Sequence, residues 1–470
     1  MKKNLIIGRE NEQKRLMNLY HSDKAEFIAI YGRRRVGKTF LIRQLFENEF
    51  VFDLAGLANA NVKEQLVNFT FSLNRATKTQ NKTAKNWLLA FELLISVIEK
   101  SPKKRKVIFF DEISWLDTPR SGFLMALEHF WNGWACSRSD VMLIVCGSAT
   151  SWIMNKLINN RGGLHNRLTA NIYLQPFTLH ETELYLQSLN CDYSRYDIAE
   201  CYMTMGGIPY YLSKIDHSLS ISQNIDNLFF AENTELKNEF QNLYASLFKN
   251  YADYIKIVEA LSIKAKGLSR QEIEKITGLS CGGGLTDTLK NLEYCGFIRS
   301  YNSFGKKKYE RLYQLLDAYT LFYFKYLAKN EYNDSAFWTN SLYTPQHNSW
   351  AGYAFEILVL QHISEIKQKL GISGIQSAVS AWKGKTAQID LIINRKDGII
   401  NICEIKFSGK EFIIDKNYEA NLRNKIFTFK EETKTRKAVH LLMLTTYGLA
   451  KNKYSSMVQK EIILDDLFKK

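Results

Sequence analysis

Paired cysteines, proline-rich linkers and membrane-length apolar runs are all missing from this sequence. Its 470 residues include 5 prolines and 7 cysteines, and no two cysteines form a C-x-x-C pair. Neither a zinc site nor a disulfide framework is therefore indicated, and reduced thiols in a cytosol are expected. The apolar stretch at residues 315–328 is too short to span a bilayer, and the N-terminus lacks the apolar core of a signal peptide. We therefore expect a soluble cytoplasmic protein with no membrane partner.

The charge of the chain is strongly one-sided. Its formal net charge is +15, and a basic surplus favours acidic partners, among which nucleic acid, with DNA favoured, is the first expectation. Lysine usage that serves only solubility is the alternative, and charge alone does not separate the two. The length suggests roughly two to four domains, and their boundaries have to be found from changes in pattern.

The stretch YGRRRVGKTFLIRQLF, Tyr31–Phe46, contains a phosphate-binding loop. It matches G-x-x-x-x-G-K-[ST], with a strand-like apolar run before it and an amphipathic helical pattern after it. Lys38 is expected to reach the β- and γ-phosphates of ATP, and Thr39 to ligate Mg²⁺. The predicted nucleotide-binding residues of this loop are Gly32, Arg33, Arg34, Arg35, Val36, Gly37, Lys38, Thr39 and Phe40.

Two further apolar runs end in polar residues that complete a hydrolytic site. The run VIFF leads into Asp111 and Glu112, where the first carboxylate can hold Mg²⁺ and the second can polarise the attacking water. The run VMLIVCG leads into Ser148, a candidate sensor of the γ-phosphate. A helix-capping role for Ser148 is the alternative.

Several motifs in order resemble the archaeal-type ATPase family of the AAA+/STAND group, whose members carry a C-terminal domain similar to PD-(D/E)xK nucleases. They are IIGRENEQKRL, GRRRVGKT, FFDEISWL, CGSATSWI, LHNRLTANIYLQPF and GGIPYYL. The resemblance implies that Gly8 and Arg9 lie near the adenine and that Pro209 belongs to a lid element approaching the base. It also implies that Arg167 is an arginine finger or phosphate sensor, with Arg161 as its rival. A finger that acts in trans would imply a homo-oligomer.

The pattern from about residue 249 predicts a winged helix-turn-helix. Ser269 and Glu272 form a capping box, Gly278 ends that helix, and a third helix is followed by two strands around a turn at residues 302–305. Such a module can place its third helix in a DNA major groove, although in STAND-type ATPases it often packs only against the nucleotide module. The candidate DNA contacts are Thr286, Lys290 and Asn291 on the helix, and Lys306, Lys307, Lys308 and Arg311 on the wing.

The C-terminal part carries a pattern typical of metal-dependent nucleases. Residues 350–372 are predicted to form one helix, in which Glu356 lies among apolar residues, and AQIDLIINRKDGIINICEIKF reads as a hairpin. Its register would place Asp390 opposite Glu404, with Lys406 on the same face. This arrangement resembles the PD-(D/E)xK fold, in which the carboxylates hold Mg²⁺ and the lysine stabilises charge. Ile389 stands where the usual Pro is expected. An ordinary hairpin with a surface E-x-K is the alternative.

We therefore expect an α/β protein: a P-loop NTPase core with a parallel sheet at 1–178, a helical lid at 179–248, a winged helix-turn-helix at 249–328 and a nuclease-like α/β domain at 329–470. One hypothesis is an Mg-ATP-driven enzyme coupled to a DNA-binding or DNA-cutting domain. The other is a signalling or scaffold ATPase whose C-terminal domain is an inactive binding platform. A lysine paired with a misaligned carboxylate at the C-terminal site would favour the second.

Overall fold

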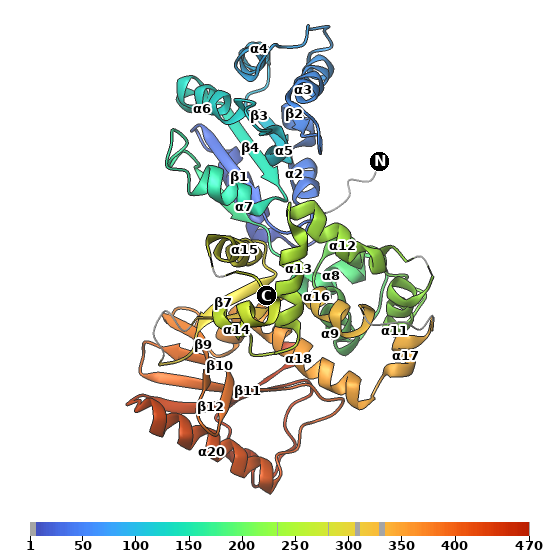
Figure 1. Cartoon of the computed structure of the whole chain (residues 1–470), viewed down its shortest axis with the longest axis vertical. Helices are drawn as coiled ribbons and strands as arrows, with labels where there is room; N and C mark the ends of the chain where they lie inside the picture. The colour runs from blue at the N-terminus through green and yellow to red at the C-terminus, as the bar shows by residue number, and fades with distance from the viewer. Residues whose placement is uncertain (1–5, 233, 281, 306–310, 329–333, 470) are drawn as a thin grey trace. The chain divides into compact units, whose positions relative to one another are not determined.

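The computed structural model describes residues 6–232, 234–280, 282–305, 311–328 and 334–469. The chain divides into two compact units, unit 1 at residues 1–176 and unit 2 at residues 177–470. Each unit is described by itself (Figure 1). Within the described residues, no helix combines the length and the apolar composition needed to cross a membrane.

Unit 1 is an α/β fold built on a parallel sheet, as predicted. The strands follow the order β2-β3-β4-β1-β5, and every neighbouring pair is parallel. Their bounds are β1 Glu26–Tyr31, β2 Phe50–Ala55, β3 Lys106–Asp111, β4 Val141–Gly147 and β5 Ala170–Tyr173. The strands β1, β3 and β4 are apolar and almost wholly buried, as expected for parallel strands covered on both faces. Because β3, β4 and β1 are neighbours, their carboxyl ends meet at one edge of the sheet.

The helices of unit 1 connect these strands by crossovers. Phe69 of α3, Phe91 of α4 and Phe130 of α6 join one core with the inner residues of the sheet. The helix α2 starts at Lys38, directly after the phosphate-binding loop, which confirms the predicted strand–loop–helix order. The bounds are α1 Glu10–Tyr20, α2 Lys38–Phe46, α3 Val62–Thr77, α4 Trp87–Lys100, α5 Ile113–Leu116, α6 Phe123–Gly133 and α7 Thr150–Ile153.

Unit 2 begins with a helical part. The tight approach of Gly207 to Phe177 shapes its first turn, because the Phe177 N–H donates to the Gly207 carbonyl over 2.6 Å and a Cβ on Gly207 would overlap the Phe177 carbonyl. An aromatic core with Tyr319, Trp338 and Trp350 lies among these helices. The bounds are α8 Leu179–Ser188, α9 Arg195–Met205, α10 Pro209–Leu212, α11 Ile221–Ile225, α12 Glu235–Leu247, α16 Ala318–Phe322 and α17 Phe337–Ser341.

The next part of unit 2 has three helices around a small antiparallel sheet of order β6-β8-β7. The Ser269–Glu272 capping box is confirmed at the start of α14, and Gly278 ends this helix in the left-handed conformation. The bounds are α13 Tyr251–Ser262, β6 Leu268–Ser269, α14 Arg270–Thr277, α15 Gly283–Tyr294, β7 Ile298–Asn302 and β8 Arg311–Leu315. The predicted wing residues Lys306, Lys307 and Lys308 lie outside the described residues.

The C-terminal part is a mixed five-stranded sheet of order β13-β12-β11-β10-β9. The strands β9, β10 and β11 run antiparallel, and β11, β12 and β13 run parallel. The helix α20 lies across one face of this sheet (Figure 1), and its Leu422 and Phe429 join the core formed by that face. The bounds are β9 Ser377–Lys383, β10 Gln388–Arg395, β11 Ile399–Lys406, α20 Lys416–Thr433, β12 Ala438–Thr445 and β13 Lys460–Ile463.

One sequence prediction is wrong in this part. The stretch 350–372 reads as one helix, but it forms the end of α18, Pro345–Gln361, and a separate helix α19, Ile363–Lys369. The break falls at buried His362, whose Nε2 accepts the Leu179 N–H over 2.9 Å and whose Nδ1 lies 2.8 Å from the Leu358 carbonyl oxygen. Burial lowers the pKa of His362, so the neutral ring accepts at one nitrogen and donates at the other.

Candidate functional site

The phosphate-binding loop joins β1 to α2 through backbone conformations that favour glycine. Gly32 has a φ of 143° and Gly37 a φ of 91°, both in the region that side chains rarely adopt. A Cβ on Gly32 would also overlap the carbonyl of Leu174, which follows β5. The loop therefore packs closely on the neighbouring strand, and α2, whose first N–H groups have no acceptor within the helix, begins directly after it.

Lys38 lies over this loop. Its side chain is buried, and Nζ donates to the carbonyl oxygens of Gly32 over 2.9 Å and of Arg33 over 2.8 Å. These two carbonyl acceptors hold the ammonium against the loop, whose backbone N–H groups can bind an anion. The Lys38 charge is thus placed at the loop and not in solvent.

Thr39 and Asp111 meet although they are far apart in the sequence. The Thr39 hydroxyl donates to Oδ2 of Asp111 over 2.8 Å, and the Cys146 thiol donates to Oδ1 over 3.1 Å. Burial, and then the Asp111 charge, raise the pKa of Cys146, so this thiol keeps its proton and remains a donor. A hydroxyl and a carboxylate side by side are the oxygen ligands that Mg²⁺ prefers.

Glu112 is aimed by the end of the neighbouring strand β4. Its Oε2 accepts from both the backbone N–H and the hydroxyl of Ser148, each over 3.0 Å. Glu112 has a φ of 44°, a left-handed conformation that costs free energy in a residue with a side chain. The capping alternative for Ser148 is wrong, because the N-cap of α7 is Ala149, without a side-chain bond. Ser148 instead positions the Glu112 carboxylate.

The segment before α1 is fixed to the phosphate-binding loop. Arg9 is buried, has a φ of 59°, and donates from a guanidinium nitrogen to the Val36 carbonyl over 3.2 Å. The Gly8 carbonyl accepts from the Gln13 side chain over 2.6 Å. Gly8 and Arg9 therefore stand beside the loop. Of the loop's other residues, Arg33 and Val36 are buried, Arg34 and Arg35 are half-buried, and Phe40 is exposed.

The remaining nucleotide-site candidates lie elsewhere. Arg161 and Arg167 are both exposed, in the stretch between α7 and β5. In the part of the chain that the structure describes, no side-chain hydrogen bond is found from either arginine to Asp111 or Glu112. Pro209 is the first residue of α10 in unit 2.

A second candidate site lies in unit 2, around buried Glu404 of β11. Oε1 accepts from the Tyr418 hydroxyl over 2.5 Å, and Oε2 accepts from Lys425 over 2.7 Å. Lys406 lies 3.4 Å from Oε1. Burial alone would raise the pKa of Glu404, but Lys425, Tyr418 and Lys406 together lower it, so the carboxylate stays charged.

Asp390 and Glu356 face the same region. The last paired residues of the hairpin are Leu391 and Cys403, so the predicted register, with Asp390 opposite Glu404, continues directly from them. Asp390 accepts from the Gln388 side chain over 2.6 Å. Burial, and then the Asp390 charge, raise the pKa of Glu356 to about 8. Across the described residues, however, no group of three or more His, Cys, Asp or Glu side chains is arranged to hold a metal ion.

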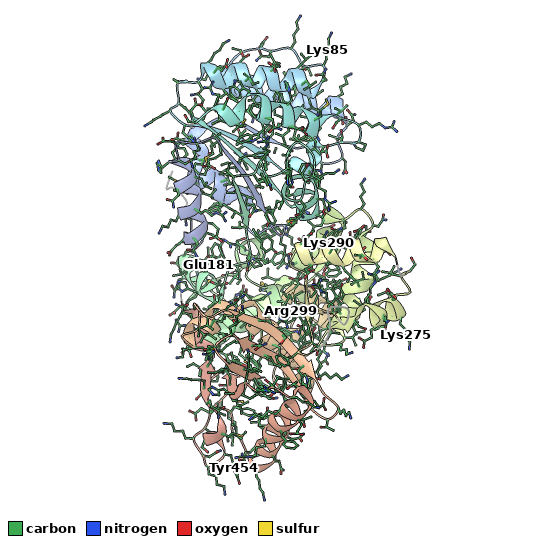
Figure 2. All side chains as sticks on the ribbon, turned by 90° about the vertical axis from the view of Figure 1, so that its left-hand side faces the viewer. Lys85, Glu181, Lys275, Lys290, Arg299 and Tyr454 are labelled. Atoms are coloured by element: carbon green, nitrogen blue, oxygen red, sulfur yellow. The ribbon has the colours of Figure 1, made fainter. Side chains whose placement is uncertain are left out.

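The predicted DNA contacts on α15 are partly engaged within unit 2. The Thr286 hydroxyl accepts from Arg270 over 2.7 Å, and the Asn291 amide donates to the Tyr254 hydroxyl over 2.9 Å. Lys290 is exposed (Figure 2), with its ammonium 5.5 Å from the Tyr294 ring centroid. Arg311 starts β8. Of this set, Thr286, Lys290 and Arg311 are exposed and Asn291 is half-buried.

Sequence reasoning missed three residues that hold these sites. Cys146 reads as part of a buried strand, and Tyr418 and Lys425 read as ordinary helix residues. Each acts on a carboxylate from another element, at separations of 14 to 35 residues. No local motif marks such contacts. A seven-residue spacing does place Tyr418 and Lys425 on one helix face, but nothing in the sequence connects that face with Glu404.

Comparisons with known proteins indicate an ATPase domain in the N-terminal part of the chain. Residues 6–215 match the family described as an ATPase domain predominantly from Archaea. The chain is 25% identical, over 409 residues, to an uncharacterized protein of Methanocaldococcus jannaschii, covering 86% of this chain and 88% of that one. It is also 42% identical, over 45 residues, to an uncharacterized ATP-binding protein of the same organism, covering 10% of this chain and 76% of that one.

A solved structure shares the fold. The Walker-type ATPase of Pyrococcus abyssi aligns with a TM-score of 0.50 and 17% identity, covering 68% of this chain and 96% of that one. The parallel sheet of unit 1 thus resembles a P-loop ATPase core. The family match ends at Ile215, so it includes α8, α9 and α10 of unit 2.

Proposed function

We propose that this protein, an ATP-hydrolysing enzyme with an ATPase domain of the predominantly archaeal family, is a Mg²⁺-dependent switch that controls nucleic-acid binding by unit 2. The contact between Thr39 and Asp111, over 2.8 Å, is the observation that supports Mg²⁺-dependent ATP hydrolysis. Their oxygens would hold Mg²⁺, which supplies charge neutralisation at the phosphates. Lys38 binds the β- and γ-phosphates, and Gly8 and Arg9 border the base.

Glu112 is the proposed residue that accepts a proton from the attacking water. The two donors of Ser148 fix its carboxylate, which supports a positioned base and not a mobile surface acid. Because the Ser148 hydroxyl donates to Glu112, we assign Ser148 the role of holding that carboxylate toward the water that attacks the γ-phosphate. Exposed Arg167, or its rival Arg161, is available to a second copy of the chain, which supports a homo-oligomer with a finger in trans.

The proposed output is binding of nucleic acid, with DNA favoured, by unit 2. The three helices and small sheet between Tyr251 and Leu315 support a winged helix-turn-helix, and the mixed sheet with α18 and α20 supports a PD-(D/E)xK-like domain after it. The first part of unit 2 is then the lid. The pairing of Glu404 with Lys425 and Lys406 favours binding over cutting, because those cations occupy the carboxylate that a metal would need.

Metal-dependent cleavage is the second candidate function. The register that places Asp390 opposite Glu404 favours it, and so does the electrostatic influence of Asp390, Glu404 and Lys406 on Glu356. Displacement of Lys425 from Glu404 would be needed before Mg²⁺ could bind there. The proposed metal ligands in this case are Glu356, Asp390 and Glu404, with Lys406 stabilising charge at the scissile phosphate.

The test compares the full chain with Lys38→Ala. Phosphate release from ATP is measured with and without DNA, and DNA binding is measured with and without ATP. We expect Lys38→Ala to abolish hydrolysis and to remove any effect of ATP on DNA binding. Normal turnover by this variant would refute the nucleotide-site assignment. DNA binding that is the same in every nucleotide state would refute the switch. Strand scission that Asp390→Ala abolishes would favour the second candidate.

A further inference from the structure

Unit 1 carries a shallow groove along α3 that is separate from the nucleotide site. Leu57, Val67 and Phe71 supply its apolar surface, and Lys63 and Glu64 line it where the helix starts. Phe71 is 61% exposed and Leu57 is 42% exposed. Among the described residues of unit 1, no other large apolar side chain is as exposed as Phe71. Apolar surface gathered in this way marks an interaction site on a soluble protein.

The apolar residues of the groove form a stripe suited to another helix. Val67 and Phe71 are four residues apart, so they lie on one face of α3, and Leu57 comes from the turn between β2 and α3. The helix α3 lies beside β2 in Figure 1. A stripe of this kind is typical of helix-in-groove recognition, in which an amphipathic helix lays its apolar face along the groove.

The residues that follow the groove along the chain are basic. Residues 65–91 contain Arg75, Lys78, Lys82 and Lys85 but neither Asp nor Glu. All four cations are exposed (Lys85 is labelled in Figure 2). No ion pair within 4.0 Å is found for any of them in the part of unit 1 that the structure describes. Their charges are therefore available to an acidic partner.

The acidic residue of the groove does not cancel this charge. The Glu64 carboxylate accepts the Asn61 N–H over 2.8 Å and completes the capping box of α3, and Lys63 is its neighbour. We propose that the groove docks an acidic amphipathic helix of a partner protein, and that docking raises ATP turnover. The proposal concerns unit 1 alone and does not depend on nucleic-acid binding by unit 2.

A protein helix fits this surface better than a nucleic acid does. Arginines and lysines attract carboxylates and phosphates alike, so charge does not separate the two ligands. The apolar surface does separate them, because a phosphate backbone gains nothing from Leu57 and Val67. The apolar face of a helix buries both residues together with Phe71 and places its carboxylates against the basic border, as in a protein interface with an apolar centre and a polar rim.

The inner side of the groove is tied to the end of β3. Gln65 of α3 is wholly buried, and its amide donates to the carbonyls of Leu57 over 2.7 Å and of Trp115 over 3.0 Å. The amide oxygen accepts the Leu57 N–H over 3.1 Å. Next to it, the Gly56 N–H donates to the Asp111 carbonyl over 3.0 Å. One buried amide thus joins Leu57 of the groove to the chain around Trp115.

This connection gives docking a route to Glu112. Trp115 lies in α5, the single turn that directly follows Glu112, and Glu112 is held in a left-handed conformation. A Cβ on Gly56 would come within 2.8 Å of the Glu112 carbonyl oxygen, so the loop packs directly on this backbone. A helix seated on Leu57 restrains the loop and, through Gln65, the backbone that aims the Glu112 carboxylate. A residue in a costly conformation depends on such support.

Peptide binding to the full-length protein tests the docking. The probe is a fluorescein-labelled peptide of about 18 residues, with Leu at i, i+3, i+4 and i+7 and Glu on the opposite face. A scrambled peptide of the same composition is the control, and a version with Lys in place of Glu tests the charge. We expect only the ordered acidic peptide to bind, and more weakly as salt rises. Equal binding of the scrambled peptide, absence of binding, or displacement by a DNA single strand would overturn the proposal.

Surface variants locate the binding site. Phe71→Ser removes the most exposed apolar side chain of the groove, and Met125→Ser, 59% exposed on α6, is its control. We expect Phe71→Ser to weaken peptide binding about tenfold and Met125→Ser to bind like wild type. Arg75→Glu should weaken binding at low salt, whereas Lys275→Glu, at an exposed position of unit 2 (Lys275 is labelled in Figure 2), should not. Equal effects of variant and control in either pair would contradict docking at this groove.

Turnover of ATP tests the coupling. With wild type, saturating acidic peptide should raise phosphate release roughly fivefold and slow amide hydrogen exchange of residues 112–116. Gln65→Met keeps the length of the side chain but loses its hydrogen bonds, so it should bind the peptide without stimulation. Peptide binding that leaves wild-type turnover and exchange unchanged would overturn the regulatory role. Stimulation that persists in Gln65→Met would overturn Gln65 as the route, because a merely structural Gln65 changes stability and not the response.

Discussion

The Thr39 hydroxyl donates a hydrogen bond of 2.8 Å to the carboxylate of Asp111, across 72 residues of sequence. This contact joins the phosphate-binding loop to the end of β3 within unit 1. The Cys146 thiol on β4 donates a second hydrogen bond to the same carboxylate, at its other oxygen. Three neighbouring strand ends thus contribute to one small polar cluster, which the surrounding apolar sheet keeps in a single geometry.

Loss of either oxygen ligand should impair the use of Mg²⁺. We expect Thr39→Val and Asp111→Asn to lower ATP turnover roughly 100-fold or more, because the metal stabilises charge at the transferred phosphate. Thr39→Ser keeps the hydroxyl and should stay close to wild type. The measurement is phosphate release across a Mg²⁺ titration. A Thr39→Val protein with a normal Mg²⁺ requirement would show that the Thr39–Asp111 pair is only structural.

Replacement of Glu112 should separate binding from hydrolysis. Glu112→Gln keeps the size of the side chain but removes the proton acceptor, a change that typically costs about 10²- to 10⁴-fold in rate. ATP affinity, measured with a fluorescent analogue, should change little. Ser148→Ala removes one of the two donors to Oε2 and should have a smaller effect on turnover. Full activity in Glu112→Gln would assign the base to another residue.

The pairing of Lys425 with Glu404 should contribute to the stability of unit 2. Lys425→Met leaves a buried carboxylate without its closest cation, and we expect a loss of up to roughly 3 kcal/mol. Adding Glu404→Gln to the Lys425→Met variant should restore part of the lost stability, because the buried negative charge of Glu404 is then removed. Urea unfolding followed by tryptophan fluorescence gives the free energy of unfolding of wild type, of the two single variants and of the double variant, which together form a double-mutant cycle. Additive single effects would mean that the two side chains do not interact.

Glu356 should make stability depend on pH in a defined direction. Its pKa is about 8 in the folded chain, against an ordinary value near 4.5, so the unfolded chain ionises first as the pH rises. The contribution of protonated Glu356 to the free energy of unfolding is therefore fully present below about pH 4.5 and is lost between about pH 4.5 and 8. In EDTA, the melting temperature of Glu356→Gln should exceed that of wild type more at pH 8.5 than at about pH 5.

Added Mn²⁺ provides the matched control for that experiment. A divalent ion that binds Glu356 and Asp390 favours the ionised carboxylate, so it should raise the melting temperature of wild type near pH 8. The Glu356→Gln variant has lost a ligand and should respond less. An equal rise in both proteins would place the ion elsewhere.

The sequence alone determined the elements that depend on local pattern. The strand–loop–helix order around Lys38 follows from an apolar run, two glycines and an amphipathic repeat. The α14 capping box follows from Ser269 and Glu272, and the Asp390–Glu404 register follows from the alternation of a hairpin around a short turn. Each of these signals is contained in a few neighbouring residues, where backbone geometry and side-chain period suffice.

Only the tertiary structure decided which side chains meet across elements. Ser148 holds Glu112 instead of capping α7, His362 at the break between α18 and α19 accepts from Leu179, and α20 brings Tyr418 and Lys425 to Glu404. These contacts arise from how helices cover sheets, and packing of that kind leaves no period or motif in the chain. The physical reason is that burial sets which charges must pair, and burial is a property of the folded chain as a whole.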